Sequence, residues 1–198
     1  MPKLPVVPMA KFRLDMAVSD LWNAYEAALS GLRAQQDEIE ETVRWRHNIG
    51  KDDELPGWAD AMDDELARTY EWASEKNESA VRGIEMVGTA FLIALFHLWE
   101  RHCNVIQQRA VFSTSAPKQM EFKPAYRREK ATLEELELAA NCAKHGVGRS
   151  CAVLFQQSPH LFTDAARRKG PSHLNLAVPE SRLIEYFDAV RSAARKDF

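Results

Sequence analysis

The chain has few of the residues that mark disulfide-rich, fibrous or disordered proteins. Its 198 residues include 3 cysteines, 8 glycines and 9 prolines, and glycine and proline are sparse between residues 11 and 110. That scarcity excludes a collagen-like or disordered chain over this region. With 45% hydrophobic and 28% charged residues, the composition is that of an ordinary globular domain.

The cysteines also exclude the usual cysteine-based frameworks. Cys103, Cys142 and Cys151 are odd in number and form no C-x-x-C pair. We therefore expect neither a disulfide nor a zinc knuckle, but small core residues in a reducing cytoplasm.

No hydrophobic run is long enough to span a bilayer. The most apolar stretch, residues 86–99, is about 14 residues long and contains His97, whereas a spanning helix needs about 20 apolar residues. We expect a buried helix and no membrane association. The N-terminus lacks the features of a signal peptide, and its three prolines predict an extended arm over residues 1–13.

Several signatures of catalysis and ligand binding are missing. The sequence contains no GxxxxGK[ST], GxSxG, HExxH or GxGxxG motif. His97 and His102 are five residues apart, so they diverge around a helix and make a poor metal site. We expect no metal and no cofactor.

Charge is spread unevenly along the chain. The net charge is −3, yet residues 36–78 alone hold 14 acidic and 5 basic residues, which leaves the remainder positive. A basic C-terminal half could meet an anion such as RNA. Uneven charge on a globular protein is the simpler interpretation of this observation alone.

Apolar residues recur at steps of three and four, which predicts helices. The expected helices cover residues 14–48, 57–77, 79–108, 132–145, a short segment after Ser150, and 180–196. The second and third can also form one continuous helix, because nothing between Ala73 and Val81 forces a break. Thr132 and Glu135 match a capping box. The prediction is an all-α bundle of five to six helices, with two long N-terminal helices and a central hydrophobic one, in one domain over residues 14–198.

A polar stripe runs along the helix expected before Gly146. Glu137, Asn141 and His145 are four residues apart and therefore neighbours on one face. Asn141 could orient the imidazole of His145, which could then act as a general acid or base. The alternative is a solvated face that ends in a histidine favoured by the helix dipole.

The hydrophobic helix carries a second polar series, His97 and Arg101 with Glu100 beside them. Polar groups on such a helix need partners if they are buried. A buried hydrogen-bond network and a functional site are both compatible with this pattern.

The stretch Asn141-Cys-Ala-Lys-His145 resembles the late motif of the HEPN superfamily of small all-α bundles. The wider NxxKHGxGxS pattern and FHLWE (96–100) are also similar to uncharacterised bacterial proteins. The resemblance implies a homodimer and a metal-independent ribonuclease of toxin–antitoxin or phage-defence systems. The motif arginine is replaced by Ala140. Arg168 and His173 have a similar spacing, but KGPS between them cannot be regular helix, so we treat that match as accidental.

If the activity implied by the resemblance is present, another cation must meet the phosphate. Arg149 is the first candidate, because the turn at Gly146 and Gly148 could bring it beside His145, and Lys144 and Arg101 follow. His145 would transfer protons and Asn141 would hold the imidazole. The alternative is a non-catalytic helical protein that binds a protein partner.

Overall fold

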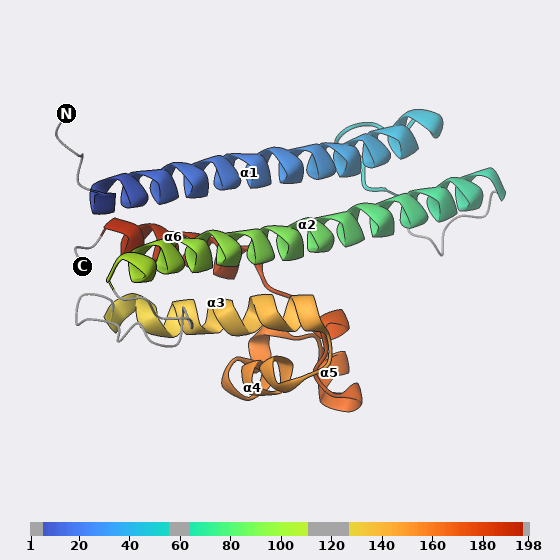
Figure 1. Ribbon diagram of the computed structural model, residues 1–198. Coiled ribbons are helices and arrows are strands. Elements are labelled where there is room, and N and C mark those ends of the chain that lie inside the picture. The colour runs from blue at the N-terminus through green and yellow to red at the C-terminus, as the bar shows by residue number, and fades with distance from the viewer. Residues whose placement is uncertain (1–5, 56–63, 111–126, 196–198) are drawn as a thin grey trace. The chain divides into compact units, whose positions relative to one another are not determined.

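The computed structural model describes residues 6–55, 64–110 and 127–195, and these form an all-α protein (Figure 1). The helices are α1 (Val6–Arg46), α2 (Asp64–Ala110), α3 (Arg127–His145), α4 (Arg149–Gln157), α5 (Asp164–Lys169) and α6 (Glu180–Arg195). Two short 3-10 segments, η4 (Pro159–Leu161) and η5 (His173–Asn175), lie in the C-terminal part. The expected all-α bundle with two long N-terminal helices is confirmed.

Several expected boundaries were wrong. The extended arm over residues 1–13 is helical from Val6 onward, because Pro8 lies in the first turn, where its missing N–H removes no intrahelical hydrogen bond. The helices expected over residues 57–77 and 79–108 form the single helix α2 over their described part. No glycine or proline interrupts the join, so the continuous alternative holds.

The chain divides into two compact units, and each contains part of α1 and part of α2. Unit 1 comprises residues 1–25 and 88–198, and unit 2 comprises residues 26–87. We describe the two units separately, and the one domain expected over residues 14–198 stays a prediction.

Unit 2 is an antiparallel helix pair. Gln36 of α1 donates a hydrogen bond to Asn77 of α2 at 2.8 Å. Leu32 packs against Gly83, where a Cβ would lie only 3.1 Å from the leucine side chain. Arg44 holds the following turn by donating to the carbonyl oxygens of Gly50 and Asp53 at 2.8 and 2.9 Å. The acidic residues noted in the sequence belong mainly to this unit.

Unit 1 contains most of the core. Aromatic rings of α1, α2 and α6 meet in it: Tyr25 lies 5.4 Å from Phe91 and 6.5 Å from Phe187, and Trp22 lies 5.0 Å from Phe187, between ring centroids. Helix α3 packs against both α4 and α6. Because α4 to η5 follow α3 directly, the sequence motif lies where several short elements converge (Figure 1).

Helix α2 is long and apolar enough to cross a membrane by length and composition alone. The central helix of a soluble protein meets the same criterion. In unit 1 this helix buries Leu92, Leu95 and Trp99 but carries His97 and Glu100, whose side chains are in contact, with Nδ1 and Oε2 3.2 Å apart. Of its most apolar 18-residue window, 22% is buried, so the helix keeps an exposed apolar surface in the part of the chain that the structure describes.

Candidate functional site

The motif of α3 ends in a tight reversal of the chain. Gly146 has φ +74°, a conformation that glycine adopts without steric cost, and its N–H donates to the carbonyl of Cys142 at 3.1 Å. Gly148 then precedes Arg149, the first residue of α4. The predicted glycine stop is confirmed, and it puts the end of α3 next to the beginning of α4.

A disulfide crosses this reversal and corrects our expectation for the cysteines. Cys142 and Cys151 are bonded, with Cα atoms 4.7 Å apart, and are nine positions apart in sequence. Both are buried, and Sγ of Cys151 lies 2.8 Å from the carbonyl oxygen of Gly146. An odd count of cysteines did not reveal which two the turn would bring together. Cys103 is free and buried, as expected of a core residue.

The predicted catalytic residues fall into two groups. His145 and Arg149 are exposed on either side of the Gly146 turn, and Asn141 is half-buried one helical turn earlier. Among the described residues, no hydrogen bond or ion pair links His145 to Arg149, Lys144 or Arg101. The site therefore consists of neighbouring groups at a surface turn, without a preformed charge relay.

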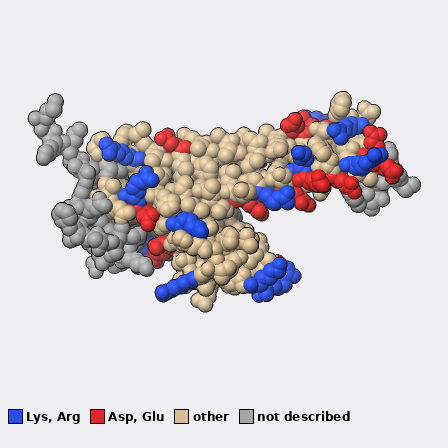
Figure 2. Space-filling model, turned by 45° about the vertical axis from the view of Figure 1, so that its right-hand side comes forward, with Lys and Arg blue, Asp and Glu red and all other residues tan. Residues whose placement is uncertain are grey.

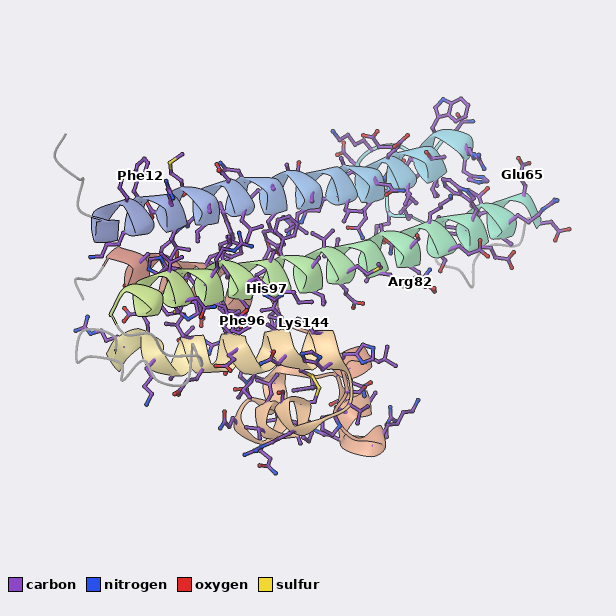
Figure 3. The ribbon with its side chains drawn as sticks, in the orientation of Figure 1. Phe12, Glu65, Arg82, Phe96, His97 and Lys144 are labelled. Carbon is purple, nitrogen blue, oxygen red and sulfur yellow. A yellow bond between two sulfur atoms is a disulfide. The ribbon has the colours of Figure 1, made fainter. Side chains whose placement is uncertain are left out.

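The second group comprises Lys144 on α3 and Glu100 and Arg101 on α2. Lys144 places its Nζ 5.2 Å from the centre of the Phe96 ring, and Figure 3 shows both side chains in the space between the two helices, beside His97. Glu100 pairs with His97 on its own helix, and Arg101 is exposed. Lys144 and Glu100 thus have contacts within unit 1, away from the exposed turn.

Sequence reasoning missed a polar cluster around Glu135. Its carboxylate accepts hydrogen bonds from Arg182 Nε and from Tyr186 OH, both at 2.6 Å, and from Ser158 Oγ. Burial disfavours the charge, but these donors hold the pKa of Glu135 below its ordinary value. Tyr186 is fully buried, and burial together with Glu135 raises the pKa of its phenol.

This cluster joins α3 and α6 to Ser158, the residue between α4 and η4. Because three donors already occupy the carboxylate, Glu135 serves as an anchor and offers little to a substrate. The predicted capping box was wrong: α3 begins at Arg127, so Thr132 and Glu135 lie inside it. The sequence did contain one signal of this cluster, because Arg182 and Tyr186 are four residues apart on an otherwise apolar face of α6.

Positive charge gathers around the turn. Residues 141–179, here called the basic lobe, contain five Lys and Arg residues and one acidic residue, Asp164. The five are Lys144, Arg149, Arg167, Arg168 and Lys169. Figure 2 shows Lys and Arg atoms at the surface around α4 and α5. His145, His160 and His173 are exposed on the same lobe.

No group of three or more His, Cys, Asp or Glu residues that could hold a metal ion occurs in the part of the chain that the structure describes. The local geometry is therefore an exposed, cationic turn with histidines, cross-linked by a disulfide. Comparison with protein-family models, curated proteins and solved structures found no match for this chain.

Proposed function

We propose that the protein is a metal-independent endoribonuclease that holds RNA on the basic lobe and uses His145 for proton transfer. The observation that carries the proposal is the Gly146 turn, which leaves His145 exposed on a lobe with five Lys and Arg residues and one acid. Cations of this kind attract the RNA backbone. An imidazole titrates near neutral pH and can move a proton there.

The neighbouring residues support a division of roles. Arg149 is exposed at the start of α4, and we assign to it the phosphate contact that Ala140, buried within α3, cannot make. Asn141 lies one turn before His145 on the same side of α3 and can orient the imidazole. Lys144 and Glu100 have partners in unit 1, so we assign them supporting roles, and Arg101 adds positive charge on α2.

Cleavage would use the RNA's own 2′-hydroxyl. Its oxygen attacks the adjacent phosphorus while a base removes its proton, the bond to the next nucleotide's 5′ oxygen breaks, and that oxygen takes up a proton. Arg149 would stabilise the negative charge that develops on the phosphate. The products carry a 2′,3′-cyclic phosphate and a 5′-hydroxyl.

The test is cleavage of a mixed RNA pool in EDTA by wild type, His145→Ala and His47→Ala. His47 lies in unit 2, outside the basic lobe, so it controls for loss of an imidazole away from the site. We expect His145→Ala to lose at least about 100-fold in rate and His47→Ala to match wild type. No cleavage by folded wild type, or equal cleavage by all three proteins, would contradict the proposal.

A second function, binding of a protein partner, is favoured by an apolar stripe on α1. Met9, Phe12 and Met16 recur at steps of three and four and are 38%, 58% and 50% exposed. Figure 3 shows Phe12 projecting outward from α1. The partner we propose is a second copy of the chain, the homodimer that the resemblance implies. Sedimentation should then give a dimer that Phe12→Ser weakens, and a wild-type monomer would contradict this reading.

A further inference from the structure

His173, which is distant in sequence, lies against the turn that carries His145. A Cβ built on Gly146 would be 3.2 Å from Nδ1 of His173. The imidazole of His173 therefore rests on the residue directly after His145, at a distance that the missing side chain of Gly146 allows. Both histidines are exposed, so a ligand at the turn can reach either ring.

Hydrogen bonds hold the segment of His173 in place. Helix α3 contacts η5. Within the segment, Asn175 Nδ2 donates to the carbonyl of Gly170 at 3.1 Å and to Ser172 Oγ at 3.2 Å. Backbone hydrogen bonds from Thr163 N to Asn175 O, at 2.9 Å, and from Ala177 N to Leu161 O, at 2.7 Å, tie it to the start of α5 and to η4. The position of His173 thus follows from several local contacts.

The break in the helix between Arg168 and His173 explains how His173 comes to lie near α3. Arg168 and His173 do not share a helix, as expected, because α5 ends at Lys169 and Gly170 has φ +86°. The same break turns the chain back, so that η5 reaches α3. His173 therefore lies beside Gly146, the residue that directly follows His145.

We propose that His145 and His173, the histidine pair, form one site in which one imidazole is the general base and the other the general acid for RNA cleavage. This inference rests on the proposed ribonuclease function and extends it. A single histidine cannot take the 2′-hydroxyl proton and protonate the leaving oxygen in the same step. Two imidazoles that both reach the same phosphate can do both.

Protons and bonds balance in this scheme. The neutral imidazole takes the 2′-hydroxyl proton as the new bond from that oxygen to phosphorus forms. The bond from phosphorus to the 5′ oxygen breaks, and the protonated imidazole gives its proton to that oxygen. The two histidines exchange protonation states and no co-reactant is consumed.

The experiment compares two substrates that differ in their leaving group. One is the dinucleotide UpA, whose 5′ alkoxide needs a proton. The other is uridine 3′-(4-nitrophenyl phosphate), whose nitrophenolate leaves without one. Wild type, His145→Ala, His173→Ala and the control His47→Ala, which lies in unit 2 outside the basic lobe, are assayed on both, after circular dichroism has shown the same helix content and melting temperature.

We expect both variants of the histidine pair to cleave UpA at least about 100-fold more slowly than wild type. Only the variant that lacks the acid should still cleave the nitrophenyl ester at close to the wild-type rate. A merely structural role for His173 would lower both reactions together.

The inference is overturned if His173→Ala cleaves UpA like wild type, or if the two variants respond alike to the two substrates. Failure of the proposed function looks different, because wild type itself would then cleave neither substrate.

Discussion

Removing the disulfide between Cys142 and Cys151 should destabilise the protein by an amount that the loop length sets. The bonded cysteines are nine positions apart. Closing a loop of that length removes about 8.7 cal/mol/K of entropy from the unfolded chain, or roughly 2.6 kcal/mol at 25 °C. With a urea dependence of about 2 kcal/mol/M, the unfolding midpoint should fall by about 1.3 M.

The assay is urea unfolding of wild type with and without a phosphine reductant, alongside the variant with both Cys142→Ala and Cys151→Ala. Reductant should shift the wild-type midpoint and leave that of the double variant unchanged. Cys103→Ala is the matched control and should keep the response to reductant. Burial raises the pKa of the Cys103 thiol to about 12, which keeps it out of thiol exchange.

The intact mass of the protein shows whether the disulfide has formed. If wild type has lost two hydrogens relative to the reduced chain and reductant still leaves its midpoint unchanged, the loop argument is refuted. If the oxidised form is never found, the pairing itself is refuted.

Two further predictions concern the anchor and the turn. Glu135→Gln should lower the free energy of unfolding by about 2 kcal/mol at pH 7. Burial opposes its charge, but the hydrogen bonds from Arg182, Ser158 and Tyr186 keep its folded pKa below the ordinary value of a glutamate. Its contribution is therefore present at pH values above that ordinary pKa and is lost as pH falls through the lower folded pKa. Wild type should therefore lose stability on acidification more steeply than Glu135→Gln, and equal pH slopes in urea unfolding would contradict this. Gly146→Ala should cost about 1 to 2 kcal/mol, since φ is +74° and a Cβ would press on His173. Gly148→Ala, with open space and extended φ, should be close to neutral by thermal unfolding, and equal losses would argue against the turn geometry.

Much of the fold followed from local patterns. The steps of three and four gave the helices, and Gly146 marked the end of α3 because glycine is suited to a positive φ. The prolines near the N-terminus led to the wrong prediction of an extended arm, because Pro8 is tolerated in the first turn of a helix. Thr132 and Glu135 misled because a capping pattern also occurs inside a helix, where Glu135 instead meets three donors from other elements.

The candidate site was less predictable because it depends on contacts between distant residues. His145 and Asn141 could be singled out from their spacing, and Arg149 as the cation that the resemblance requires in place of the motif arginine. His173 could not, since only the packing of η5 on α3 brings it to Gly146. The disulfide was missed for the same reason. Because disulfides persist in oxidising compartments, the cysteine-based argument for a reducing cytoplasm loses its basis.

The measurement that tests the proposed function most directly uses a DNA oligonucleotide with one internal ribonucleotide, incubated with wild type in EDTA. Mass spectrometry identifies the ends of the products. The account predicts one cut, 3′ to the ribonucleotide, that leaves a 2′,3′-cyclic phosphate and a 5′-hydroxyl and is absent with His145→Ala. An intact oligonucleotide, or ends with a 5′-phosphate and 3′-hydroxyl, would contradict it.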